Sequence, residues 1–229
     1  MRRCAIGVMA RAPSSGGKSR LGAGVSPARL TALRSALLAD TLDVVGRAVD
    51  LFSFDATIFV TPRDGAAEIS TLSDRLWPAA AQSEGDLGER MRTALAHLVD
   101  SGAASAMLVG TDIPLLTVAH LAAARDLLET SGGVVLGPAE DGGYFLVGMR
   151  HVHAAIFDGV EWGTASVLTD TLRLADRAGI EVRLIDGGYD VDTLDDLRRL
   201  ERDLASAAAA DVAPHMRVWF AARDGDELF

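Results

Sequence analysis

Apolar residues along the chain form short runs of strand length, separated by longer stretches in which they recur at helical spacing. Short apolar runs bounded by glycine, proline and polar residues are typical of buried strands. Their alternation with helical stretches predicts an α/β fold with a mostly parallel sheet and helices on both faces. The predicted strands span residues 4–10, 55–61, 75–80, 105–110, 133–138, 144–149 and 181–185.

Four predicted helices begin at residues that suit a helix N-terminus. Ser26 is followed by a proline, which favours the first helical position, and leucines then recur on one face. Thr117 and Thr164 begin two further helices. Thr193 and Asp196 have the spacing of a capping box, which predicts a fourth helix after the last strand.

The end of the chain has a weaker pattern. The alanine run at residues 207–210 is interpreted as the end of the fourth helix. The apolar segment VAPHMRVWF, residues 212–220, fits either an edge strand or an oligomer contact, since each would bury it. We therefore expect a single domain over residues 1–210, a C-terminal extension of unknown role over 211–229, and a possible homodimer.

Composition narrows the class of protein. Hydrophobic residues make up 49% of the chain, yet no stretch approaches the roughly 20 apolar residues of a membrane helix. The 32 acidic against 22 basic residues give a net charge of −10, which argues against a general nucleic-acid-binding surface. The single cysteine, Cys4, fits a reducing compartment, and the apolar run near the N-terminus is too short for a typical secretory signal. A cytoplasmic protein is expected.

The loop after the first predicted strand, ARAPSSGGKSRLGAG, has features of a phosphate-binding loop. Ser15, Gly16 and Gly17 offer small side chains and backbone N–H groups that can approach an anion closely. Lys18 and Arg20 add positive charge beside them. The spacing is not that of a Walker motif, and a flexible surface loop with solvated bases is the alternative interpretation.

The stretch GTDIPLL places Asp112 directly after the apolar run at residues 105–110. A carboxylate at the end of a strand, directed into a crevice, can bind Mg²⁺, which takes oxygen ligands and bridges to substrate phosphates. The alternative is an aspartate that stabilises a tight turn through its own backbone. One carboxylate seldom holds Mg²⁺ well, so a metal site here would need a second oxygen ligand.

Two later loops also carry acids. Glu140 and Asp141, followed by Gly142 and Gly143, lie between two apolar runs, where a hairpin turn is the simplest structural interpretation.

In the later loop DGGYDVDTLDDL, Asp190 and Asp192 are two residues apart in an extended segment, so their side chains point to the same side. Asp192 could also act only through favourable electrostatics at the N-terminus of the following helix.

Five segments in this order carry a family resemblance: KSRL, EGDLGERM, GTDIPLL, GPAEDGGYFLVG and DVDT. Together they resemble the bacterial glycosyltransferase-A-like family DUF2064, of the nucleotide-diphospho-sugar transferase superfamily. That family is related to nucleotidyltransferases of the molybdenum-cofactor and 2-phospholactate guanylyltransferase type. The likeness covers roughly residues 5–200, and the combination is more specific than any single segment.

The resemblance implies a fold, a metal site and a nucleotide site. The implied fold is a Rossmann-like three-layer α/β/α sandwich with a mostly parallel mixed sheet. The implied ligands of Mg²⁺ or Mn²⁺ are Asp112 and Asp192. Arg90 would lie near the crevice on the nucleotide side, and the acceptor side would include Glu140, Gly142, Gly143, Tyr144 and Trp162.

Three functions are consistent with these residues. In a nucleotidyltransferase, an acceptor phosphate or hydroxyl would attack the α-phosphorus of an NTP, with Lys18 neutralising the developing charge. In a glycosyltransferase, Glu140 or Asp141 would deprotonate an acceptor hydroxyl beside a nucleotide-sugar donor. A non-catalytic nucleotide-binding module would require Asp112 and Asp192 to be structural. The expected partners are a nucleotide and a small-molecule acceptor, with no nucleic acid and no membrane.

Overall fold

A computed structural model describes residues 3–206 and 211–222. Its centre is one seven-stranded sheet with the order β3-β2-β1-β4-β6-β5-β7. Only β6 runs antiparallel to its neighbours β4 and β5, so the sheet is mixed but mostly parallel, as predicted. The strands are β1 (Cys4–Arg11), β2 (Asp55–Thr61), β3 (Ala79–Ala81), β4 (Ser105–Val109), β5 (Val134–Pro138), β6 (Tyr144–Met149) and β7 (Val182–Leu184).

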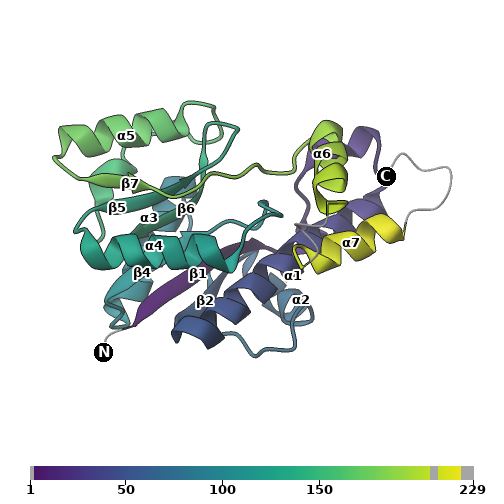
Figure 1. Ribbon diagram of the computed structural model, residues 1–229, viewed down its shortest axis with the longest axis horizontal. Coiled ribbons are helices and arrows are strands. Elements are labelled where there is room, and N and C mark those ends of the chain that lie inside the picture. The colour runs from purple at the N-terminus through teal and green to yellow at the C-terminus, as the bar shows by residue number, and fades with distance from the viewer. Residues whose placement is uncertain (1–2, 207–210, 223–229) are drawn as a thin grey trace.

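Helices cover both faces of this sheet, which confirms the predicted three-layer α/β/α sandwich (Figure 1). On one face, apolar side chains of α1 (Pro27–Phe52), α2 (Ala66–Ser70) and α4 (Val118–Thr130) pack on the strands. On the other, α3 (Leu87–Asp100) and α5 (Val167–Arg177) do the same. Within the described residues, no helix combines the length and the apolar character needed to cross a membrane.

Helix α1 extends beyond the sheet into a third apolar cluster. The helix is 26 residues long and begins where the Ser26 side chain accepts a hydrogen bond from the Arg29 backbone N–H. Its first turns pack against α6 (Leu194–Leu204) and α7 (Pro214–Ala221), which lie together at one end of the molecule (Figure 1). The buried residues of this cluster include Leu30, Leu33, Leu37, Leu197, Leu200, Met216 and Trp219.

Two expected elements differ in extent from the prediction. The strand expected at residues 75–80 is much shorter and lies later, as β3 (Ala79–Ala81). It is an edge strand with little burial, so the apolar pattern that locates a central strand is missing there. The helix expected from Thr164 begins a few residues later, as α5 (Val167–Arg177) with Ser166 at its N-cap.

The expectation of an edge strand in VAPHMRVWF was wrong, because most of the segment forms helix α7 on α1 of the same chain. Met216 and Trp219, three residues apart, are both buried, which is a helical and not an alternating pattern. Residues 211–222 therefore help to close a core cluster. The alanine run at residues 207–210, expected to end α6, lies outside the described residues.

The N-terminus of α7 is held by a buried carboxylate of α1. Asp40 is only 4% exposed, and it accepts hydrogen bonds from the backbone N–H groups of His215 (2.9 Å) and Met216 (3.0 Å). These are two of the donors that a helix leaves unpaired at its start. Burial raises the pKa of Asp40 to about 6, against the lowering effect of these hydrogen bonds and of the nearby His215 ring, while Asp43 raises it slightly.

This raised pKa predicts a pH-dependent stability that Asp40→Asn removes. A folded-state pKa near 6, above the usual 3.8, means that the folded state binds the proton more tightly. The contribution is complete below pH 3.8 and is lost as the pH rises through 6, with an upper bound of roughly 3 kcal/mol. Urea unfolding from pH 4 to pH 7 should show the parent losing stability relative to Asp40→Asn. A difference that is constant across this range would contradict the assignment.

Candidate nucleotide and metal site

A cleft of about 450 Å³ lies at the carboxyl edge of the sheet. Its walls come from the loops after β1 and β4, the β5–β6 hairpin, the start of α3 and the segment before α6. Open α/β sheets bind ligands at this edge, near the point where the strand order reverses. Ten predicted site residues line it: Gly16, Gly17, Lys18, Arg90, Asp112, Asp141, Gly143, Tyr144, Trp162 and Asp192.

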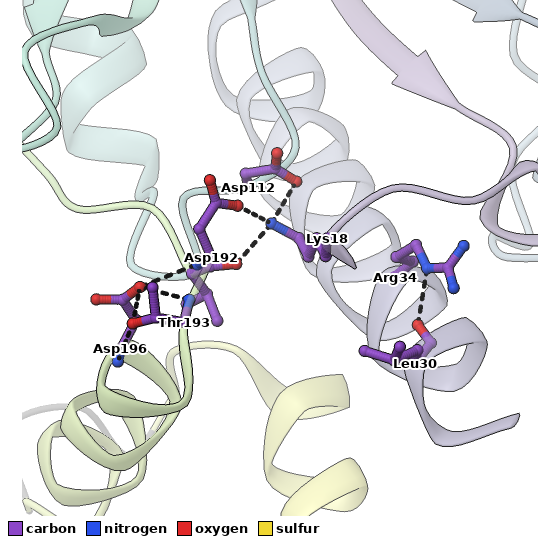
Figure 2. A network of polar contacts seen from close by, with 8 residues as sticks. Lys18, Leu30, Arg34, Asp112, Asp192, Thr193 and Asp196 are labelled. Atoms are coloured by element: carbon purple, nitrogen blue, oxygen red, sulfur yellow. Dashed lines mark hydrogen bonds and ion pairs between the residues drawn. The ribbon is translucent and has the colours of Figure 1, made fainter. Parts of the chain in front are cut away.

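The central feature of the cleft is the Lys18 ammonium group, which lies between two carboxylates (Figure 2). Its Nζ is 3.2 Å from Oδ1 of Asp112 and 3.2 Å from Oδ1 of Asp192, and it donates a 2.6 Å hydrogen bond to the Val191 carbonyl. The Lys18 side chain is 5% exposed, whereas the carboxylates are 55% and 40% exposed. The two carboxylates are therefore open to solvent in the cleft, whereas the ammonium group between them is covered.

Local structure on both sides fixes this arrangement. Lys18 has a left-handed backbone (φ 54°), which is uncommon for a residue with a side chain and costs of order 1–3 kcal/mol. Asp192 stands directly before the capping box of α6, where Asp196 accepts from the backbone N–H groups of Asp192 (3.1 Å) and Thr193 (2.7 Å). The Val191 N–H donates to the Asp112 carbonyl at 3.1 Å, which joins the β4 loop to the α6 segment.

The donors in the cleft fit a divalent metal ion. Asp112 and Asp192 each present an oxygen at the same distance from one nitrogen, so these oxygens lie within twice that distance of each other. Asp141 and Asp190 also line the cleft. Burial, followed by the carboxylates of Asp141 and Asp192, raises the pKa of Asp190. Converging carboxylate oxygens are the hard donors that Mg²⁺ and Mn²⁺ prefer.

Among the described residues, another cluster of potential metal ligands lies at the contact of α1 with α7. Asp40, Asp43 and His215 each place a potential ligand atom within 4.8 Å of the others, at the α1–α7 contact and away from the cleft. Their hydrogen bonds are already used: Asp40 caps α7, and the His215 ring lies 3.1 Å from Asp43. These contacts give the cluster a structural role.

The predicted phosphate-binding residues are only partly gathered in the cleft. Gly16 and Gly17 have positive φ (95° and 112°), and they line the cleft with Arg90, whose Nε donates to the Gly85 carbonyl at 3.0 Å. Ser15 donates its hydroxyl to the Ala12 carbonyl.

Among the residues described as lining the cleft, neither Ser15 nor Arg20 is found; Arg20 is exposed on the 3-10 helix at Ser19–Ala23. Their phosphate contacts stay predictions.

The two adjacent acids of the hairpin point to different surroundings. Asp141 lines the cleft, and its Oδ1 accepts a 2.8 Å hydrogen bond from the Gly143 N–H, as in a turn. Glu140 instead pairs with both terminal nitrogens of Arg199, at 2.6 and 2.8 Å. These hydrogen bonds lower the pKa of Glu140, and Arg199 also stacks 3.8 Å from the Tyr189 ring.

A hairpin turn was predicted at Gly142 and Gly143. The antiparallel pairing of β5 and β6 on either side of these glycines confirms it. Gly142 has φ 91°, and a Cβ there would lie 2.1 Å from the Ala165 carbonyl oxygen. Glycine is therefore required for the hairpin to pack against the segment before α5.

Aromatic side chains pack together along one wall of the cleft. The Trp162 ring meets Tyr144 edge-on at 6.3 Å, lies 6.4 Å from Phe157, and covers Gly88 at the start of α3. Burial raises the pKa of Tyr144 well above its ordinary value. Trp162 therefore contributes to the core and to the surface of the cleft at once.

Some features of the site were missed by reasoning from the sequence. The ion pairs of Lys18 join it to residues 94 and 174 positions away, and no local pattern predicts them. Gln82 lines the cleft and donates to the carbonyls of Ala10 and Phe59. One signal was available: Lys18 is the only lysine in a chain whose other basic residues are arginines.

The fold and the cleft define a transferase of the nucleotide-diphospho-sugar transferase fold. The chain belongs to the family described as "uncharacterized protein conserved in bacteria" (DUF2064), whose model matches residues 41–164. No curated protein matches the chain in sequence.

Three solved structures illustrate the likeness. A candidate nucleotide-diphospho-sugar transferase from Desulfovibrio desulfuricans G20 is 30% identical, over 96% of each chain, with a TM-score of 0.86. Rv0371c from Mycobacterium tuberculosis H37Rv, in complex with manganese, is 21% identical over 87% of this chain and 97% of that one (TM-score 0.54). CMP:2-keto-3-deoxy-manno-octonic acid synthetase, complexed with CTP, is 12% identical over 89% and 98% (TM-score 0.55).

The contact between Gly88 and Trp162 predicts that Gly88→Ala disturbs the aromatic wall of the cleft. The new Cβ would lie 2.6 Å from Cζ2 of Trp162, so the ring must move. We expect a loss of about 1–3 kcal/mol of unfolding free energy, although alanine favours a helix, and a changed tryptophan fluorescence spectrum. Gly132→Ala is the matched control, because nothing lies within 4 Å of its Cβ position. Equal stability and spectra in the two variants would count against the packing role.

Proposed function

We propose that this protein is a nucleotidyltransferase that depends on Mg²⁺ or Mn²⁺. It transfers a nucleotidyl group from an NTP to a small phosphorylated or hydroxyl acceptor. The acceptor oxygen attacks the α-phosphorus, the bond from that phosphorus to the bridging oxygen breaks, and pyrophosphate leaves with that oxygen. The observation that carries the proposal is the convergence of Asp112, Asp192 and the only lysine, Lys18, beside a glycine loop in one cleft.

Residues from two sides of the cleft would bind the nucleotide and the metal ion in this proposal. The backbone N–H groups of Gly16 and Gly17 and the side chains of Lys18 and Arg90 bind and orient the triphosphate. Asp112 and Asp192 would hold the divalent ion, which when bound neutralises phosphate charge. Catalysis then comes mainly from positioning and electrostatic stabilisation.

Asp141 lies on the acceptor side of the same cleft. One of its oxygens holds the Gly143 N–H, and we assign the other as the base that takes the proton of an acceptor hydroxyl. Tyr144 and Trp162 form the adjoining wall. Glu140 is held by Arg199, which makes it the weaker candidate for this base.

Glycosyl transfer from a nucleotide-diphospho-sugar donor is the second candidate. It is favoured by the name of the 30% identical structure from Desulfovibrio desulfuricans G20. The CTP complex of the synthetase and the manganese complex of Rv0371c support a nucleotide and a divalent ion for either reaction. Assays of pyrophosphate release from NTPs and of nucleoside diphosphate release from nucleotide-sugars separate the two. A cytoplasmic location and a homodimer remain predictions.

The proposed metal site predicts that Asp112→Asn and Asp192→Asn each lower turnover by at least about 10²-fold. Loss of a partner that only supports a metal ligand typically costs 10–100-fold, and loss of a ligand should cost more. Isothermal titration with Mn²⁺ should show weakened metal binding in both variants. Asp195→Asn, an 89% exposed acid on the nearby α6, is the matched control. If both Asp112→Asn and Asp192→Asn retain the Mn²⁺ affinity of the parent, these residues do not form a metal site.

The base assignment predicts that Asp141→Asn keeps nucleotide affinity but lowers turnover by about 10²–10⁴-fold. The asparagine oxygen can still accept from the Gly143 N–H, so the turn is retained. Comparison with Glu140→Gln shows which of the two acids carries the loss. Unchanged turnover in Asp141→Asn, with nucleotide binding measured alongside, would reduce Asp141 to a turn residue.

A further inference from the structure

Oxygen atoms surround the Lys18 ammonium group closely in the observed arrangement. A lysine ammonium group has three N–H donors. Nζ donates hydrogen bonds to the Val191 carbonyl at 2.6 Å and to Asp192 Oδ1 at 3.2 Å, and it forms an ion pair with Asp112 Oδ1 at 3.2 Å. Two of the three donors are used, and the third N–H lies beside the Asp112 carboxylate. A phosphate oxygen would therefore have to compete with Asp112 for Lys18.

A divalent ion on the same two carboxylates would oppose this ammonium group. An ion at metal–oxygen distances of 2.0–2.6 Å from Asp112 Oδ1 or Asp192 Oδ1 would lie within about 6 Å of Nζ, whichever side it occupies. A double and a single positive charge at that separation repel strongly in a partly covered site. The two cations would also draw on the same two carboxylate groups. We therefore expect the metal ion and the ammonium group to be alternative partners of the Asp112 and Asp192 carboxylates.

The segment before Lys18 is able to let the side chain move. Gly16 and Gly17 precede it in conformations with positive φ. A Cβ at Gly16 would meet nothing within 4 Å, and one at Gly17 would meet only Cδ of Arg11 at 3.8 Å. Lys18 itself holds a left-handed backbone at the N-cap of a short 3-10 helix. Little packs against the Cβ positions of Gly16 and Gly17, so the backbone directly before Lys18 has room to change conformation.

We propose that Lys18 is an internal counter-cation that the divalent ion replaces on Asp112 and Asp192, and that the displaced ammonium group then binds the nucleotide's phosphates. This inference rests on the proposed function, since it concerns the same metal and nucleotide. Metal binding frees Lys18 for the phosphates, and phosphate binding keeps Lys18 away from the metal ligands. The two ligands therefore bind with positive coupling through one side chain.

Mn²⁺ titration without nucleotide, followed by electron paramagnetic resonance of unbound Mn²⁺, tests this exchange. Lys18→Met removes the competing charge and should tighten Mn²⁺ binding about tenfold or more. Lys18→Arg keeps the charge and should show no tightening. Arg20→Met removes a charge from the exposed part of the same loop and controls for long-range electrostatics, which are largely screened at 0.15 M salt. The same Lys18→Met variant should bind an NTP more weakly, a change of opposite sign.

A second measurement uses the wild-type protein and does not depend on how any variant folds. Because Lys18 is the only lysine, acylation by an amine-reactive reagent can modify only Lys18 and the N-terminal amine. At 5% exposure Lys18 should react slowly, and Mn²⁺ alone should accelerate its acylation several-fold while the N-terminal amine is unaffected. Mass spectrometry after proteolysis separates the two sites.

The outcomes distinguish this inference from the proposed function. Unchanged or weaker Mn²⁺ binding in Lys18→Met, or Lys18 acylation unaffected by saturating Mn²⁺, overturns the exchange. If Asp112→Asn still loses Mn²⁺ in that case, the metal site of the proposed function stands. If both cleft variants bind Mn²⁺ as the parent does, the metal site fails and the exchange fails with it.

Discussion

A single ammonium group joins three parts of the chain at the carboxyl edge of the sheet. Lys18 reaches from the loop after β1 to Asp112 after β4 and to Asp192 before α6. Without this positive charge, two carboxylates would face each other across a partly covered cleft, and like charges at such separations repel. This ion pair and the hydrogen bond from the Val191 backbone N–H to the Asp112 carbonyl both attach the segment before α6 to the cleft. Because this segment leads into α6, these contacts connect the cleft with the third core cluster, to which α6 contributes Leu197 and Leu200.

Much of the fold could be predicted because burial leaves a pattern in the sequence. The central strands β1 and β4 are almost wholly buried, so their apolar runs are continuous. The edge strand β3 is not, and its position was misjudged for that reason. Helix α7 was missed because its apolar residues were interpreted without their spacing, although Pro214 at its first turn and buried residues three apart indicate a helix.

The candidate site was predictable in its parts and not in its connections. Strand ends locate Asp112 and Asp192, because ligands of parallel sheets gather where strands end. Their common partner Lys18 lies far away in the sequence, 94 positions before Asp112 and 174 before Asp192. The pairing of Glu140 with Arg199, which turns one acid of the hairpin away from the cleft lining, is also long-range. Such contacts follow from the tertiary fold, and local periodicity carries no record of them.

Diffraction from crystals grown with Mn²⁺, with the anomalous signal recorded to locate the ion, tests the central claim most directly. Our account predicts one strong peak between the carboxylates of Asp112 and Asp192, with Lys18 Nζ moved out of hydrogen-bonding distance from at least one of them. A peak confined to Asp40, Asp43 and His215, with Lys18 still bridging the two cleft carboxylates, would contradict it.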